Sequence, residues 1–207
     1  MPETRILLDE GHQRLIKARH GYVLYNRNDT VIGRSIETYG EYFESEVRVF
    51  RRFVEAGDVA LDVGANIGTH TLALARLAGP QGFVYAFEPQ RLVFQTLCAN
   101  IALNSLTNVH CVNAAVGEEA GTLRMSDADP KQPNNFGGAQ VALLGSGQQG
   151  VPVTRVVLDD FLDVDRLKLV KIDVEGMESE VLRGAHRTLA RFKPLLYVEN
   201  AFADKSP

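Results

Sequence analysis

Short apolar runs alternate with helix-forming segments along the chain from residue 58 onward. An alternation of strand, helix and strand is typical of parallel sheets whose two faces are covered by helices. The sequence therefore predicts an α/β fold with a doubly wound, mostly parallel sheet. The five expected strands cover Val59–Val63, Phe83–Phe87, Val109–Asn113, Lys168–Asp173 and Leu195–Glu199.

The chain before residue 58 does not follow this alternation. Residues 1–20 are expected to be irregular or weakly helical, and short extended pieces are expected at 22–25 and 31–33. Apolar residues spaced by four, three and four then predict an amphipathic helix over residues 43–54. We divide the chain into a lead-in with a cap helix, residues 1–57, and a ligand-binding domain, residues 58–207.

A Gly- and Pro-rich stretch, residues 118–157, interrupts the domain and predicts a small antiparallel insertion near the ends of the strands. Its expected strands are Thr122–Met125, Gln140–Leu144 and Pro152–Val157. An insertion at this place forms a wall or lid over a ligand site.

Composition excludes several classes of protein. The net charge is -4, which argues against a nucleic-acid partner, because such proteins need a broad basic surface. No apolar stretch reaches the roughly 20 residues of a transmembrane helix. Two cysteines, Cys98 and Cys111, are too few for a disulfide framework or a four-thiolate zinc site. The charged first residues do not resemble a secretory signal, so we expect a reducing, cytoplasmic location.

The segment Asp62-Val63-Gly64-Ala65-Asn66-Ile67-Gly68 joins the first of these strands to a helix through a glycine-rich turn. Gly64 allows a sharp bend and a close approach of a ligand to the backbone. The following helix start offers unpaired N–H groups that suit a carboxylate or phosphate. A nicotinamide site needs glycines at positions 66 and 69, where this chain has Asn66 and Thr69.

The acid at Asp62 also disfavours a dinucleotide. Two like charges about 4 Å apart repel by about 4 kcal/mol at an effective dielectric constant of 20, whereas a ligand with an amino group and a sulfonium is attracted. Glu88 ends the next strand, where an acid accepts hydrogen bonds from a ribose diol. A nucleoside joined to an amino acid, S-adenosylmethionine, fits both positions.

These motifs, taken together, resemble the FkbM family of class I methyltransferases over roughly residues 20–200. The resemblance is carried by residues 40–42, 57–68, 87–89, 113–117, 171–178, 184–185 and 199. It implies a Rossmann-like fold, S-adenosylmethionine as methyl donor, and O-methylation of a hydroxyl on a sugar, a glycolipid or a natural product.

The same resemblance assigns the cofactor residues by position. It implies that Asp62, Gly64, Asn66 and Gly68 line the methionine end. Glu88 would hold the ribose, and the Asn113-Ala114 segment would lie near the adenine.

Asp173 and Glu175 follow the fourth strand, where a class I enzyme faces the methyl acceptor. We expect one of these carboxylates to orient or deprotonate a hydroxyl group. We expect no metal site; a cation held by Asp173, Glu199 and Asn200 is the alternative, because hard oxygen ligands suit Mg²⁺. His70, in the first turn of the glycine-loop helix, is a further candidate base.

Residues after Glu199 are too few to supply the antiparallel hairpin of a complete class I sheet. The exposed edge at Leu195–Val198 then needs a cover, and a second copy in a homo-oligomer would provide one. Two other functions stay open: a binding protein without turnover and, less favoured, a nicotinamide-dependent oxidoreductase. The expected partner is a small-molecule or glycan methyl acceptor.

Overall fold

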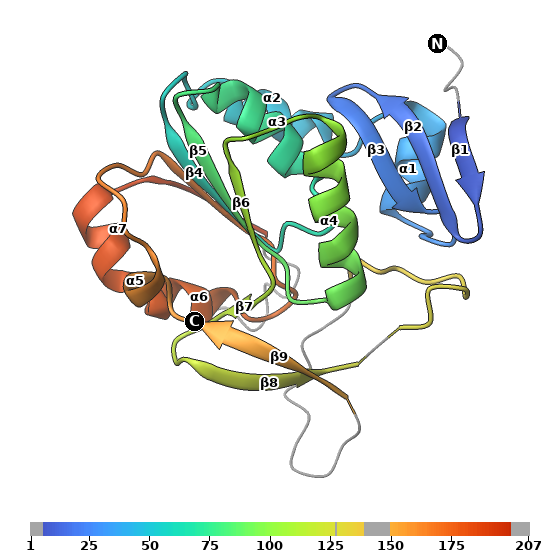
Figure 1. Cartoon of the computed structure of the whole chain (residues 1–207). Helices are drawn as coiled ribbons and strands as arrows, with labels where there is room; N and C mark the ends of the chain where they lie inside the picture. The colour runs from blue at the N-terminus through green and yellow to red at the C-terminus, as the bar shows by residue number, and fades with distance from the viewer. Residues whose placement is uncertain (1–5, 127, 139–149, 200–207) are drawn as a thin grey trace.

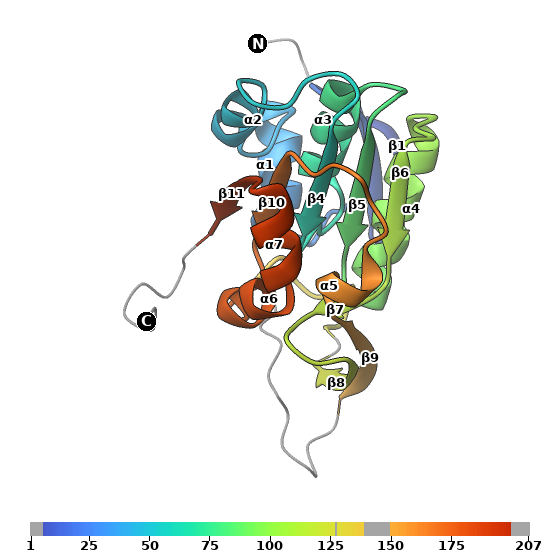
Figure 2. The same ribbon diagram turned by 90° about the vertical axis from the view of Figure 1, so that its left-hand side faces the viewer.

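The centre of the protein is a five-stranded parallel sheet, and Figure 2 shows its strands side by side. The computed structural model describes residues 6–126, 128–138 and 150–199. The strand order is β11-β10-β4-β5-β6, and the register of every pair is parallel. The strands are β4 (Val59–Val63), β5 (Phe83–Phe87), β6 (Val109–Val112), β10 (Leu169–Ile172) and β11 (Leu195–Val198). The sequence-based prediction of five parallel strands is confirmed.

Helices cover both faces of this sheet (Figure 1). One face packs on α2 (Glu44–Phe50), α3 (Thr69–Ala78) and α4 (Arg91–Leu103). The other packs on α5 (Leu158–Phe161), α6 (Glu178–Gly184) and α7 (His186–Phe192). Successive side chains of a strand point to opposite faces, so Leu61 joins one cluster and its neighbour Ala60 joins the other.

The N-terminal segment is a sheet, so the expectation of an irregular or weakly helical lead-in is wrong. It forms an antiparallel meander of β1 (Ile6–Glu10), β2 (Gln13–Ala18) and β3 (Gly21–Asn26), followed by α1 (Ile32–Tyr39). The piece expected to be extended at 31–33 is the start of α1. The helix expected over 43–54 is present but shorter, since α2 covers only Glu44–Phe50.

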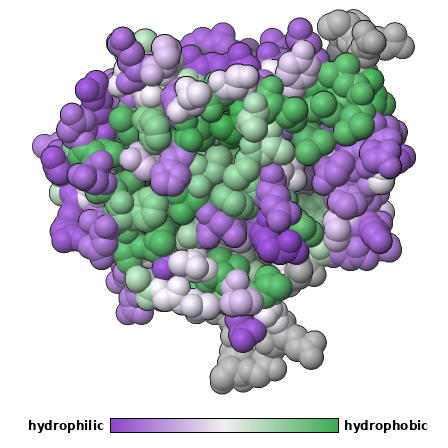
Figure 3. Space-filling view, in the orientation of Figure 1, coloured by the Kyte–Doolittle hydropathy of each residue, from purple (hydrophilic) through white to green (hydrophobic). Residues whose placement is uncertain are grey.

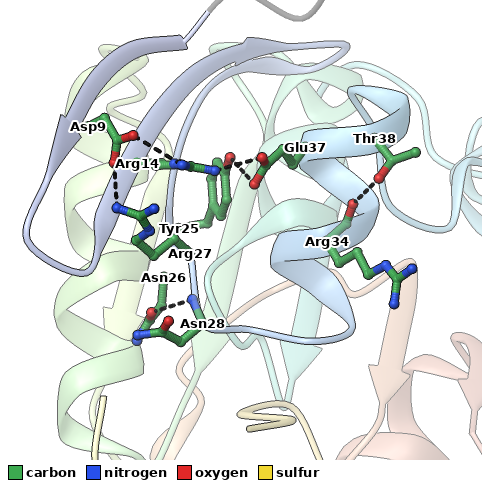
Figure 4. Close-up of polar contacts among 9 residues, drawn as sticks. All are labelled: Asp9, Arg14, Tyr25, Asn26, Arg27, Asn28, Arg34, Glu37 and Thr38. Atoms are coloured by element: carbon green, nitrogen blue, oxygen red, sulfur yellow. Dashed lines mark hydrogen bonds and ion pairs between the residues drawn. The ribbon is translucent and has the colours of Figure 1, made fainter. Parts of the chain in front are cut away.

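Arg14 of β2 ties this meander together, as Figure 4 shows. Its guanidinium lies 3.0 Å from an Asp9 oxygen of β1 and 2.6 Å from a Glu37 oxygen of α1. The hydroxyl of Tyr25, on β3, donates a second hydrogen bond to Glu37. Tyr25 is fully buried and belongs to the same apolar cluster as Ile36 of α1. The meander and α1 are therefore joined by both polar and apolar contacts.

The predicted insertion is present next to the carboxyl end of the sheet. β8 (Gly121–Met125) pairs antiparallel with β9 (Val151–Val156), and the short β7 (Ala115–Val116) pairs parallel with β9. The strand expected at Gln140–Leu144 lies outside the described residues. None of the helices in the described ranges has the length and apolarity that crossing a membrane requires.

Candidate functional site

A cavity of about 260 Å³ lies at the carboxyl ends of the parallel strands. Residues that directly follow four of the five strands line it: Gly64 after β4, Glu88 after β5, Asp173 after β10 and Glu199 after β11. The strand order places Glu88 on one side of Gly64 and both Asp173 and Glu199 on the other. Neighbouring strands are about 4.8 Å apart, so the cavity extends across several strand spacings.

The glycine-rich turn after β4 forms the floor of this cavity. Gly64 has a φ of 79°, and a Cβ atom there would stand 1.7 Å from the backbone oxygen of Asp173. Its neighbour Ala65 and Gly64 itself both donate backbone hydrogen bonds to the oxygen of Phe87. Only glycine fits this close approach of two strand ends. The sequence analysis predicted a sharp bend and the approach of a ligand at Gly64, and the close neighbour in the structure is the backbone of Asp173.

Glu88 is almost completely buried and still lines the cavity. Its two oxygens accept hydrogen bonds from the backbone N–H groups of Asn66, at 2.9 Å, and Gln90, at 2.8 Å. Burial raises the pKa of the Glu88 carboxyl to about 7, although both hydrogen bonds act in the opposite direction. A carboxylate has about four lone-pair positions, so each oxygen can accept one more hydrogen bond from a ligand.

Asp62 is not among the residues that line the cavity, and its contact with a ligand stays a prediction. Its side chain is fully buried beneath the turn, where one oxygen accepts a hydrogen bond from the Thr71 hydroxyl at 2.6 Å. The other oxygen lies 3.1 Å from the Lys171 ammonium. Burial is the largest influence and raises the pKa of Asp62, but the Lys171 charge, His70 and the hydrogen bonds from Thr71 and Lys171 together bring the pKa below its ordinary value.

Gly68 and Asn113 also stand behind the cavity wall. Gly68 begins α3 with a φ of 89° and packs closely on Leu97. The Asn113 side chain donates hydrogen bonds to the backbone oxygens of Glu88 and Pro89, so it fixes the loop after β5. Asn66 and Ala114, by contrast, line the cavity. The expected cofactor residues therefore divide into lining residues and residues that support them.

Lys171 is a site residue that the sequence analysis missed. It lies within β10, is 2% exposed, and has its ammonium 3.1 Å from Asp62, 3.3 Å from Asp173 and 3.1 Å from the oxygen of Gly64. Burial lowers the pKa of Lys171, but the two carboxylates raise it well above its ordinary value. A lysine inside an apolar strand of a parallel sheet was the available signal, because buried lysines are almost always paired.

Asp173 and Glu175 both line the cavity beside β10. Glu175 adopts a left-handed backbone, with a φ of 53°, so the chain turns away from the strand direction there. Burial and the neighbouring Asp173 charge raise the pKa of Glu175. The structure therefore brings the two predicted catalytic carboxylates to one cavity, together with Glu199.

His70 faces the same cavity from α3, next to Tyr42. Its Nε2 atom lies 3.3 Å from a Glu46 oxygen, and burial lowers the pKa of His70 to about 4. His70 is therefore neutral at physiological pH. No set of three or more metal-ligating side chains gathers at one point within the described ranges, and Asn200, one ligand of the alternative cation site, lies outside them.

A sequence model of the Methyltransferase FkbM domain matches residues 62–206, which is more than half of the chain. The chain belongs to the FkbM methyltransferase family. This FkbM-family chain is 30% identical over 146 residues to a hexuronic acid methyltransferase of Haloferax volcanii, a match that covers 69% of this chain and 56% of the relative. It is 31% identical over 143 residues to Methyltransferase 1 of Beauveria bassiana, covering 60% and 57%.

A shorter match joins this FkbM-family chain to the 31-O-demethyl-FK506 methyltransferase of Streptomyces tacrolimicus. It is 43% identical over 70 residues and covers 34% of this chain and 26% of the relative. A solved FkbM methyltransferase structure from Methylobacillus flagellatus is 18% identical, with a TM-score of 0.49, over 79% of this chain and 42% of that one. The chain spans little more than half the length of the Haloferax volcanii and Beauveria bassiana relatives.

Proposed function

We propose that this protein binds S-adenosylmethionine and transfers its methyl group to a hydroxyl of a sugar, a glycolipid or another natural product. The observation that carries the proposal is the single cavity that joins Glu88 and the glycine-rich turn to Asp173 and Glu175. The first pair suits a nucleoside attached to an amino acid, and the second pair suits a hydroxyl that loses a proton. Family membership supports the same reaction.

The residues present fit S-adenosylmethionine as the donor. Glu88 lines the cavity with free lone pairs for two ribose hydroxyls, and the backbone of Gly64 lines the same cavity. Asn66 and Ala114 would complete the contacts. When bound, the donor supplies an electrophilic methyl group on a positively charged sulfur. The excess of carboxylates over the lysine at the cavity attracts that charge and disfavours a diphosphate.

The acidic side of the cavity indicates the charge of the methyl acceptor. Asp173, Glu175 and Glu199 line it, and Lys171 is already shared with Asp62. A neutral hydroxyl can donate its proton to a carboxylate there, whereas a carboxylate or phosphate on the reacting group is repelled. The names of two relatives mention 31-O-demethyl-FK506 and a hexuronic acid, and a hexuronic acid carries a carboxylate, so the charge near the reacting group separates acceptor classes.

Calorimetric titration with S-adenosylhomocysteine tests donor binding. We expect binding by the unchanged protein and at least 10-fold weaker binding by Glu88→Ala, because a hydrogen bond to a charged group contributes about 1.5–3 kcal/mol. Glu118→Ala is the matched control, since Glu118 is exposed, pairs with Arg183 and does not line the cavity. Far-ultraviolet circular dichroism shows that each variant is folded.

Two results would contradict the proposal. One is the absence of S-adenosylhomocysteine binding, combined with binding of NADH in a fluorescence titration. The other is equal S-adenosylhomocysteine affinity for Glu88→Ala and Glu118→Ala. Turnover is followed by mass spectrometry of a cell extract incubated with isotopically labelled donor, which also identifies the methyl acceptor and the atom that receives the label.

A further inference from the structure

The carboxyl groups of Asp173 and Glu199 meet at the outer side of the cavity. The last paired residues of β10 and β11 are Ile172 and Val198, so the next residue of each strand stands beside the other. The backbone N–H of Glu199 still donates to the oxygen of Ile172 at 2.9 Å, which continues the ladder to this point. Both side chains line the same cavity, next to each other at the ends of paired strands.

Lys171 makes the two carboxyl groups unequal. Its ammonium lies 3.3 Å from an Asp173 oxygen and is held in place by the buried Asp62 carboxylate on its other side. The lysine charge lies next to Asp173, and the raised pKa of Glu199 places the proton held by the pair on Glu199. The hydrogen bond with Asp173, more than partial burial, raises the pKa of Glu199 to about 7.

Other titratable groups face the pair from several elements. Two more acids, Glu175 and Glu46, add negative charge and favour retention of the proton. His70 is neutral because burial lowers its pKa to about 4. Among the described residues, the titratable groups that face the pair include Glu46, Tyr42, His70, Glu175, Lys171 and Tyr197.

We propose that Asp173 and Glu199 form one proton-accepting pair for the methyl acceptor's hydroxyl, with Lys171 as a positioning residue. The inference rests on the proposed methyltransferase function and assigns its proton acceptor. In the step, the hydroxyl oxygen forms a bond to the methyl carbon while its proton passes to the carboxylate pair. The carbon–sulfur bond breaks, and its electron pair stays on sulfur, which becomes neutral.

A carboxylate pair is a better general base than a single aspartate. A carboxylate with a pKa near 4 is a weak base, and a base is most effective when its pKa lies close to the working pH. In the pair, the proton that reaches either oxygen is shared by both groups. Below about pH 7 Glu199 already holds a proton, so the pair is ready to accept the hydroxyl proton only at higher pH.

An NMR titration tests the pair without any methyl acceptor. Carbon-13 carboxyl resonances are followed from pH 4 to 9 in the protein saturated with S-adenosylhomocysteine, and the Glu199 signal is the one missing from Glu199→Gln. We expect this signal to titrate near pH 7 and to move toward the ordinary value of about 4.3 in Asp173→Asn. Titration near 4.3 in both proteins would overturn the proposal.

Rates supply the second measurement. Initial rates of labelled methyl transfer into the small-molecule fraction of a cell extract are recorded against pH at saturating donor, because the pKa of Glu88 also lies near 7 and affects donor binding. We expect the rate to rise toward a plateau above pH 7. Glu199→Gln should lower the plateau 100-fold or more and remove the rise, as loss of a general base does.

The controls separate this proposal from the proposed function. Glu178→Gln, whose carboxylate accepts a hydrogen bond from Gly176 outside the cavity, should keep both the rate and the pH profile. If Glu175→Gln removes the rise and Glu199→Gln keeps it, Glu175 is the base and the pair is refuted. If the unchanged protein does not bind S-adenosylhomocysteine, the proposed function itself fails; normal binding with an unaltered Glu199→Gln profile refutes only the pair.

Discussion

The side chain of Lys171 shows how one buried charge organises the site. It connects Asp62, which is fully buried beneath the glycine-rich turn, with Asp173, which reaches the cavity. Removal of one member of a buried ion pair leaves the other charge without compensation, and this costs about 3–5 kcal/mol. Lys171 therefore contributes both to stability and to the position of Asp173.

We predict that Lys171→Met lowers the free energy of unfolding by about 3–5 kcal/mol. The double variant Asp62→Leu, Lys171→Met should recover most of this loss, because it removes both buried charges. Urea unfolding followed by circular dichroism measures the difference. Equal stability of the single variant and the unchanged protein would show that Asp62 is neutral in the native state, against the direction of its pKa shift.

A second prediction at this scale concerns Gly64. An alanine at this position places Cβ 1.7 Å from the Asp173 oxygen and in a left-handed backbone, so we expect Gly64→Ala to destabilise the protein by more than about 4 kcal/mol or to prevent folding. Gly121→Ala, where nothing stands within 4 Å, should change the melting temperature little. Thermal unfolding measures the melting temperatures of the two variants. Similar values would contradict the close contact between Gly64 and the Asp173 oxygen.

The residue scale also shows which part of the site the sequence could predict. Glu88, Asp173 and Gly64 directly follow strands, and parallel strands bring their carboxyl ends to one edge, so topology alone places them together. Lys171 lies inside a strand, where a lysine indicates a buried, paired charge but does not identify its partners. Its role depends on the distances to Asp62 and Asp173, which only the folded chain defines.

At the scale of elements, the N-terminal meander is the part that the sequence did not predict. All five residues of β1 are exposed, so β1 lacks the alternation of apolar and polar residues that identifies a half-buried strand. Figure 3 shows apolar side chains beside the N-terminal end of the described chain, where Ile6, Leu7 and Leu8 are exposed. The meander is stabilised by contacts that are distant in sequence, and local propensity does not report those contacts.

Asn100 of α4 connects the meander to the glycine-rich turn through three side-chain hydrogen bonds. Its side-chain amide donates to the oxygens of Leu24 and Ile67, and its oxygen accepts from the N–H of Leu24 at 2.6 Å. The residue is fully buried, so loss of the side chain leaves these backbone groups unpaired. Asn104, one turn later, makes similar bonds to Tyr22 at an exposed place.

We therefore predict unequal effects for two asparagines on the same helix. Asn100→Ala should destabilise the protein by about 3 kcal/mol, and Asn104→Ala by about 1 kcal/mol or less, because water replaces exposed hydrogen bonds. Amide hydrogen exchange of β3 measures the effect on the meander, and urea unfolding measures the total. Equal losses for the two variants would show that burial at Asn100 does not govern this contact.

For the whole molecule, one apolar cluster crosses the boundary that the sequence suggested at residue 57. Ile16, Val23 and Tyr25 of the meander and Ile36 of α1 share it with Leu97 of α4. The cluster also includes Ala65 and Ile67 of the glycine-rich turn. The meander therefore packs behind the glycine-rich turn that forms the floor of the cavity. The apolar core is continuous across residue 57, and the domain division at that residue stays a prediction.

A shared core predicts that the meander and the parallel sheet unfold together. The sequence has no tryptophan, so Tyr22→Trp on β3 introduces a single fluorescent probe at a partly exposed position. We expect its fluorescence and the far-ultraviolet circular dichroism to report the same urea midpoint, because two probes of one cooperative unit coincide. If fluorescence changes at a lower urea concentration than circular dichroism, the meander unfolds separately. S-adenosylhomocysteine would then shift only the second transition, since a ligand stabilises the unit that binds it.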